Sequence, residues 1–96
     1  MAADVYYDEF EWDDDKAASN RARHGVTFEE AATVFDDPHA IEAPDLLRAG
    51  RFVIIGLSTQ ARVLFVVHAE AVQGRIRLIS ARKASPAQRR IYEKGE

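Results

Sequence analysis

The sequence predicts an α+β fold with a mainly antiparallel sheet of four to five strands, two N-terminal helices and a short C-terminal helix. Three observations predict this class. Residues 63–83 form two β-rich runs around a turn that contains Gln73 and Gly74, which is typical of a hairpin. Two helix start signals precede the hairpin, and a third follows it. The 96 residues have the length of one domain, assigned to residues 10–96 after a flexible acidic extension over residues 1–9.

The first elements are a short strand and a helix. Phe10 and Trp12 alternate with polar residues, which favours a strand that ends at the aspartates following it. Asp13 or Asp14 can cap a helix over residues 15–23, and Gly25 suits the position just after its end.

The second helix begins at a capping box. The Thr27 hydroxyl can bond the third amide of the helix, and Glu30 can reach back to the capping residue. An apolar stripe that includes Phe28 and Phe35 extends this helix over residues 28–35, where Asp37-Pro38 ends it.

Strands and one helix fill the rest of the chain. Residues 40–43 and 51–57 read as strands, and residues 63–67 are apolar on both faces, as in a central strand. Residues 75–80 alternate, so the sequence predicts one face with Ile76, Leu78 and Ser80 and the other with Arg75, Arg77 and Ile79. The series Ser85-Pro86-x-Gln88 starts a last helix over residues 86–93.

Composition excludes several classes of protein. The absence of cysteine rules out a disulfide scaffold and a thiolate metal site. No apolar run reaches the length of about 18 residues that a membrane helix needs. The acidic N-terminus lacks the basic region of a signal peptide, so a cytoplasmic location is expected.

Charge is distributed unevenly between the two halves of the chain. Residues 1–45 carry 3 basic and 13 acidic residues, whereas residues 46–96 carry 10 basic and 3 acidic residues. A basic half indicates a polyanionic partner, nucleic acid first. The alternative is that the two halves neutralise one another across the fold.

The chain has no Gly-rich phosphate loop, no nucleophile elbow and no metal-binding spacing of its three histidines, so no cofactor or metal is expected. Two polar groupings remain. Lys16, Asn20 and His24 recur at every fourth residue and share one helix face, which is either a functional row or a solvated surface. His68 and Glu70 share one face of the central strand.

These groups suit RNA cleavage without a metal. That reaction needs a base for the 2′-hydroxyl proton, an acid for the leaving 5′-oxygen and cations for the phosphate. Histidine, glutamate and tyrosine can transfer protons, and arginine binds phosphate through its two-pronged guanidinium. The hairpin is expected to hold several guanidinium groups together on a rigid sheet.

Two separated motifs extend over most of the chain. The first is Phe10-Glu-Trp-Asp-x-x-Lys16-x-x-x-Asn20-x-x-x-His24-Gly25-Val-Thr-Phe28, and the second is Arg77-Leu-Ile-Ser80-Ala-Arg82-Lys83-Ala followed by Arg89-Arg90-x-Tyr92-Glu93. Together these motifs resemble those of the BrnT-type toxins. The resemblance covers residues 10–94. It implies a RelE-like ribonuclease toxin of a type II toxin–antitoxin pair, neutralised by a BrnA-type antitoxin that also binds operator DNA.

The resemblance and the residue types together give the candidate site. We predict catalytic roles for Lys16, His24, Glu70, Arg77 and Arg82, with Glu70 or His68 as the base. RNA contacts are predicted for Asn20, Arg62, His68, Arg75, Lys83 and Tyr92. One departure from the family pattern is the acidic run Asp13–Asp15, which would repel phosphate unless it faces away from the site.

Two other functions fit parts of the sequence. The basic half can belong to a catalytically inactive module that binds an acidic antitoxin and acts as a co-repressor. A DNA-binding regulator would use Arg89 and Arg90 on the last helix, although no helix-turn-helix pattern supports it.

Overall fold

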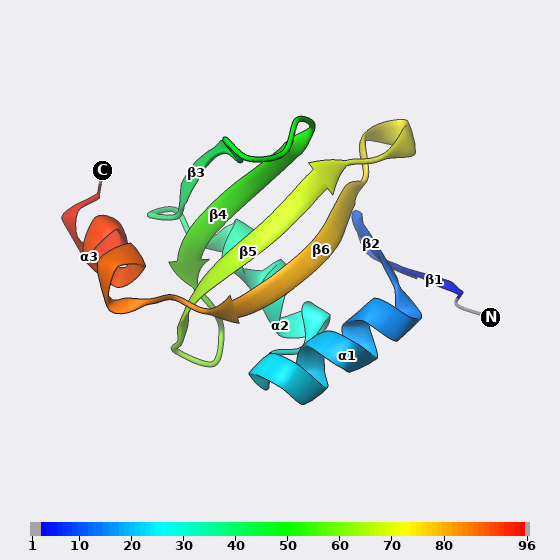
Figure 1. Ribbon diagram of the computed structural model, residues 1–96, viewed down its shortest axis with the longest axis horizontal. Coiled ribbons are helices and arrows are strands. Elements are labelled where there is room, and N and C mark those ends of the chain that lie inside the picture. The colour runs from blue at the N-terminus through cyan, green and yellow to red at the C-terminus, as the bar shows by residue number, and fades with distance from the viewer. Residues whose placement is uncertain (1–2, 96) are drawn as a thin grey trace.

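The computed structural model describes residues 3–95 and confirms the α+β class. Six strands, three α-helices and two 3₁₀ helices follow one another along this range (Figure 1). In chain order they are β1 (Asp4–Tyr7), β2 (Phe10–Asp13), α1 (Asp14–His24), α2 (Phe28–Thr33), η1 (Val34–Asp36), β3 (Ile41–Pro44), β4 (Arg51–Leu57), β5 (Val63–Glu70), η2 (Val72–Gly74), β6 (Ile76–Lys83) and α3 (Pro86–Lys94). None of the helices within residues 3–95 is long and apolar enough to span a bilayer.

The sheet corrects the expected four to five mainly antiparallel strands, because it has six strands and is mixed. The strand order is β1-β2-β6-β5-β4-β3. Strand β2 pairs in parallel with the start of β6, through Phe10 opposite Ile76 and Glu11 opposite Arg77, and the other pairs are antiparallel. The predicted hairpin over residues 63–83 is confirmed as β5 and β6, with Gln73 and Gly74 at positive φ in its turn.

The expected flexible extension contains a strand. Residues 4–7 form β1, which folds back on β2 through a turn where Asp8 has a φ of 52°. Met1 and Ala2 lie outside the described residues. The extension was not recognisable as a strand because its partner is only four residues long and its own residues are mostly exposed.

A β-bulge changes the faces predicted for β6. Val67 pairs with Ser80 whereas His68 pairs with Leu78, so Ile79 is an extra residue in β6. Ser80 therefore lies on the face opposite Leu78, and the predicted alternation is wrong beyond Leu78. The register recovers with Ala81, which is fully buried on the helix-covered face.

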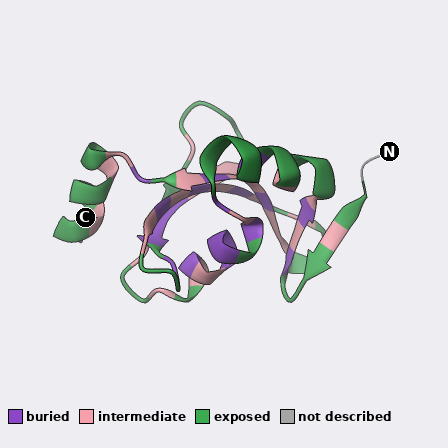
Figure 2. Cartoon of the chain, turned by 90° about the horizontal axis from the view of Figure 1, so that it is seen from below, coloured by how far each residue is buried: buried purple, intermediate pink, exposed green. Residues whose placement is uncertain are grey.

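The core lies between the sheet and the two N-terminal helices. Helices α1 and α2 cover one face of the sheet, and buried residues line the space between them (Figure 2). Trp12 and Phe28 meet there edge to face, with their ring centroids 5.7 Å apart. Helices α1 and α2 do not cover the opposite face of the sheet, and the side chains on that face are partly exposed.

The helix caps follow the predictions with one exception. Asp13 accepts a hydrogen bond from the Lys16 amide at the start of α1, and Ser85 and Gln88 form a complete capping box on α3. Thr27 caps α2, but the Glu30 side chain does not reach back to it. Instead the buried Glu30 carboxylate binds Arg62 and Ser58, because a partner distant in sequence replaces the local one.

Gly56 lies where β4 crosses the α2–η1 segment. A methyl group built on Gly56 would come within 2.7 Å of Val34 Cγ1 and 2.9 Å of the Ala40 Cβ. Gly56→Ala is therefore expected to lower the free energy of unfolding by about 1–3 kcal/mol, because the close-packed core must shift. Urea unfolding of Gly56→Ala is compared with that of Gly50→Ala. Gly50 has open space around it but a positive φ of 81°, so the comparison separates the effect of crowding from that of backbone strain. A loss confined to Gly50→Ala would contradict the predicted crowding.

The Tyr92 phenol links helix α3 to the rest of the fold. The Tyr92 hydroxyl donates to Asp37 Oδ2 at 2.6 Å, and this hydrogen bond raises the pKa of Tyr92 to about 12. Burial alone would raise the pKa of Asp37, but hydrogen bonds from the Leu57 amide and from Tyr92 outweigh it and lower that pKa. Tyr92 thus anchors α3, and its hydroxyl is already engaged.

Candidate functional site

Asn20 fixes α1 against the edge of β6. Its Nδ2 donates to the carbonyl oxygens of Ala81 (2.8 Å) and Val26 (3.0 Å), and its Oδ1 accepts from the Ala81 amide (3.0 Å). Strand β2 covers only the start of β6, so the Asn20 carboxamide replaces a strand neighbour at Ala81. Asn20 is only 6% exposed, and its fixed position sets where the rest of α1 lies.

A hollow of about 240 Å³ lies between α1 and β6, and we call it the cationic hollow. Its lining includes three basic side chains, two hydroxyls and the bulge residue, namely Lys16, Arg23, His24, Ser19, Ser80 and Ile79, with Asn20 behind them. Among the described residues, no aspartate or glutamate lines it. The acidic start of α1 therefore lies outside this hollow, and the hollow suits an anionic ligand.

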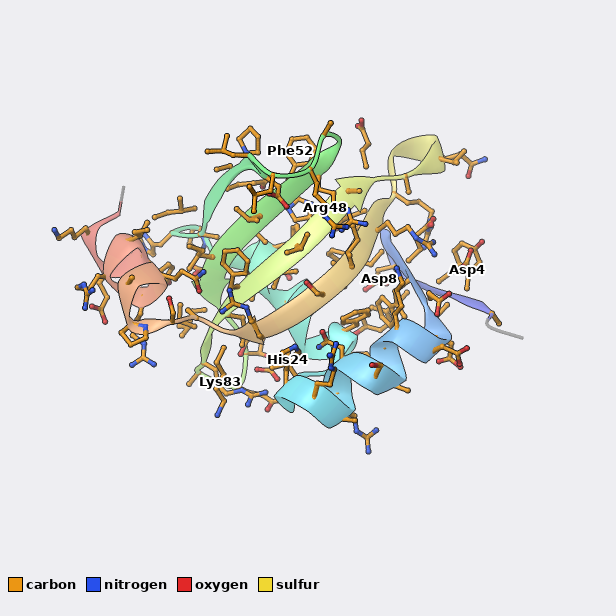
Figure 3. The ribbon with its side chains drawn as sticks, viewed as in Figure 1. Asp4, Asp8, His24, Arg48, Phe52 and Lys83 are labelled. Carbon is orange, nitrogen blue, oxygen red and sulfur yellow. The ribbon has the colours of Figure 1, made fainter. Side chains whose placement is uncertain are left out.

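A second basic hollow continues from the C-terminal end of α1. Arg62 donates to the carbonyl oxygen of Gly25, the residue after His24, and pairs with the buried Glu30. The hydrogen bond from Arg62 is the main reason that the pKa of Glu30 is lowered. Arg62 also lines a hollow of about 310 Å³ with Lys83 and Arg89. Lys83 and His24 both lie in the lower part of the view in Figure 3.

The arginines of the hairpin do not converge as the sequence predicted. Arg77 binds Glu11 at 2.6 Å and Asp4 at 3.1 Å, and the hydrogen bond to Asp4 is the main reason its pKa is raised. Arg75 donates to the carbonyl oxygens of Asp8 and Phe10. The acidic N-terminal hairpin thus occupies both guanidinium groups, and it lies away from His24 and Lys83 (Figure 3).

Arg82 takes a third direction, onto the face of the sheet that α1 and α2 leave open. Its guanidinium lies 4.6 Å from the ring centroid of Phe65, its neighbour across the β5–β6 pair. The guanidinium also lies within weak hydrogen-bond distance of Gln88, at 3.4 Å. Arg62, Arg77 and Arg82 therefore lie in three separate environments, because each meets a partner that is distant in sequence.

His68 and Glu70 lie at the other end of the sheet, around a hollow of about 280 Å³. The His68 ring packs against Phe35 edge to face and is stacked with Phe52, at centroid distances of 4.9 and 5.9 Å. Burial lowers the pKa of His68, although Glu42 opposes this in part. Glu70 lies at the exposed rim, so the structure brings His68, Glu70 and Arg75 together but keeps them apart from Lys16 and His24.

The buried imidazole predicts how stability depends on pH. Because the pKa of His68 is lower in the folded state than its ordinary value of 6.5, the unfolded chain binds the proton more readily. The free energy of unfolding is expected to be unaffected by His68 above pH 6.5 and to fall as the pH drops below it. Urea unfolding between pH 7 and 5 checks this, with His68→Gln predicted to flatten the dependence. An equally steep loss in His68→Gln would assign it to other groups.

Comparison with known proteins decides the family. Residues 12–88 match the model of a family described as the ribonuclease toxin, BrnT, of type II toxin–antitoxin systems. This chain is a member of the BrnT family. The chain is also similar to the crystal structure of the Brucella abortus ribonuclease toxin BrnT, with 26% identity and a TM-score of 0.64. That similarity covers 77% of this chain and 92% of the other. No curated protein matches.

The residues that match the BrnT family include those of the cationic hollow, but they do not include the acidic side chains of the N-terminal hairpin that pair with Arg77. Lys16, His24 and Ser80 fall within residues 12–88, whereas Asp4 and Glu11 precede this range. The acidic partners of Arg77 thus precede residues 12–88, the part of this chain that matches the family model.

Sequence reasoning missed Arg23, Ser19 and Ser80 as parts of the site. Arg23 follows Lys16 by seven residues and so continues the same helix face, a signal that was present in the sequence. Ser80 carried no such signal, because the bulge at Ile79 moved it to another face.

Proposed function

We propose that this BrnT family member is a metal-independent RNA endonuclease that binds the scissile phosphate in the cationic hollow. The observation that carries the proposal is the set of three basic side chains of α1 that line the hollow beside β6, with no carboxylate among the described residues of the lining. Lys16, Arg23 and His24 are free of the ion pairs that engage Arg62 and Arg77 among the described residues. Unpaired cations in a hollow are what an incoming phosphodiester requires.

The proposed chemistry follows from these side chains. His24 takes the proton of the 2′-hydroxyl, whose oxygen then attacks the adjacent phosphorus. Lys16 and Arg23 stabilise the charge on the pentacoordinate phosphate, and Lys16 donates a proton as the bond to the 5′-oxygen breaks. Asn20 acts through position, since it holds α1 beside Ser80. Glu70 and Arg77 remain predicted contributors outside this hollow.

RNA on either side of the cut is proposed to follow the basic side chains beyond the hollow. Lys83 and Arg89 line the next hollow, and Arg82 lies two residues beyond Ser80 on β6. Among residues 3–95, no group of three His, Cys, Asp or Glu side chains is placed to hold a metal ion.

The family relationship supports the biological part of the proposal. A toxin of a type II system has an antitoxin, and we propose a BrnA-type partner that neutralises this chain and carries it to operator DNA. Cleavage of cellular RNA would arrest translation in the cytoplasm. The antiparallel β3–β6 core of the sheet, with helices on one face, supports a RelE-like classification of the fold.

Cleavage of a labelled RNA by the purified chain in excess chelator tests the proposal. Wild-type protein is expected to cleave, and Lys16→Ala to cleave about 10- to 100-fold more slowly, because one charge on the phosphate is lost. Arg21→Ala is the matched control, since Arg21 is an exposed cation of the same helix that lines a different hollow. Absence of cleavage by folded wild-type protein would contradict the proposal and favour the antitoxin-binding co-repressor.

A further inference from the structure

The hollow around His68 has features that the proposed cleavage chemistry does not use. It is lined by Phe35, Phe52, Glu42, Glu70, Arg75 and His68, among others, and has a volume of about 280 Å³. This volume lies just below the range of sites for drug-sized ligands, so it suits a single planar ring system. Phe35 and Phe52 pack against the His68 ring and also line the hollow, and aromatic rings are surfaces on which bases stack in RNA-binding proteins.

Two buried polar atoms at this hollow have no hydrogen-bond partner in the described part of the chain. Among residues 3–95, only His68 Nε2 and Arg75 Nε are buried side-chain atoms without a hydrogen-bond partner. Both residues line the same hollow, and His68 is only 5% exposed. Glu42 Oε2 lies 3.8 Å from His68 Nε2, and Glu11 Oε1 lies 3.8 Å from Arg75 Nε, and both distances are too long for a hydrogen bond. Buried polar atoms normally have hydrogen-bond partners. Two such atoms without partners at one hollow therefore indicate that a polar ligand binds there.

Charge at the hollow excludes the phosphate group as that ligand. Glu42 and Glu70 place two carboxylates there, whereas the Arg75 guanidinium already donates to the carbonyl oxygens of Asp8 and Phe10. Burial lowers the pKa of His68, which favours the neutral imidazole. The hollow therefore favours a neutral ligand that offers hydrogen-bond donors to carboxylates.

We propose that this hollow binds a guanine base of the RNA substrate. Guanine is flat, and its N1–H and N2–H groups form a paired donor edge that matches a carboxylate such as Glu42 or Glu70. Its O6 and N7 atoms are acceptors, which suit the remaining donors of Arg75 and His68. Adenine and the pyrimidines lack this combination of two adjacent donors with two acceptors. The inference rests on the proposed function, because it treats the base as part of an RNA that the chain cleaves.

Nucleotide titrations followed by NMR test the guanine site directly. Wild-type protein is expected to bind GMP about tenfold more tightly than IMP, because IMP lacks the 2-amino donor to a carboxylate, and more tightly again than AMP. The shifted signals should come from Phe52, His68 and their neighbours. All three nucleotides carry one phosphate, so the comparison cancels binding at the cationic hollow.

Two variants with exposed carboxylates extend the test without disturbing the core. Glu42→Gln and Glu70→Gln are made separately, and at least one is expected to remove the preference for GMP over IMP. Glu93→Gln on α3 is the matched control and should keep that preference. Equal affinity for GMP, IMP and AMP in the wild type, or shifts confined to α1, would overturn the guanine site.

RNA cleavage by the same preparations separates this inference from the proposed function. Cleavage without any guanine preference near the cut, together with no GMP selectivity, overturns the guanine site and leaves the nuclease proposal standing. Selective GMP binding by a chain that cleaves no RNA overturns the nuclease proposal and supports the base-binding pocket alone.

Discussion

Replacing His24 with alanine is expected to lower the rate of RNA cleavage about 10²- to 10⁴-fold, the range for loss of a general base. The imidazole lies in the cationic hollow with Lys16 and Arg23, where it can accept the proton of a bound 2′-hydroxyl. His24 is exposed at the end of α1, so its removal should leave the fold intact. Single-turnover cleavage, with saturating protein, measures the chemical step.

His39→Ala is the matched control for this prediction. His39 is an exposed histidine that lines a different hollow, beside α3. The control should cleave at the wild-type rate. If His24→Ala also cleaved within threefold of wild type, the base would have to be sought elsewhere, first at Glu70.

Asn20→Ala is expected to cost about 3–4 kcal/mol of the free energy of unfolding. The substitution leaves the Ala81 amide, the Ala81 carbonyl and the Val26 carbonyl without partners, and each such buried group costs about 1–3 kcal/mol when partial hydration is possible. This loss is a large share of the 5–15 kcal/mol that stabilises a typical domain. Urea unfolding measures it, and cleavage should fall with it because α1 loses its position.

Ser19→Ala provides the reference for that stability change. Ser19 precedes Asn20 on α1 and is exposed. Ser19→Ala should therefore lower the free energy of unfolding by less than about 0.5 kcal/mol. A cost below about 1 kcal/mol for Asn20→Ala would show that water replaces the carboxamide, and that Asn20 is free to contact RNA as the sequence first suggested.

Local signals in the sequence predicted local structure well. The central hairpin, the Asp13 and Ser85 caps and the glycine at the end of α1 were all recognisable, because each depends on residues within a few positions of one another. The Glu30 capping box failed for the opposite reason, since its carboxylate found Arg62, 32 residues away, and Ser58.

Contacts between residues that are distant in sequence also determine which side chains meet in the candidate site. The alternation of β6 placed Arg77 on a face with other cations, but the parallel pairing of β2 and β6 brought Glu11 beside it. No periodicity in either strand predicts that pairing. The row of Lys16 and His24 was predictable because it follows the helical repeat, although the hollow that it forms with Ser80 depends on the bulge at Ile79.

The central claim is that substrate phosphates bind between α1 and β6, and an NMR titration with a non-cleavable RNA tests it most directly. An RNA oligonucleotide with a 2′-O-methyl group at every position has no free 2′-hydroxyl to attack the phosphorus, so it binds without being cut. The largest amide shifts are predicted at Lys16, Arg23, His24 and Ser80, weakening as salt is raised. Shifts centred instead on Arg75, Arg77 and the β1–β2 hairpin, with α1 unchanged, would contradict the claim.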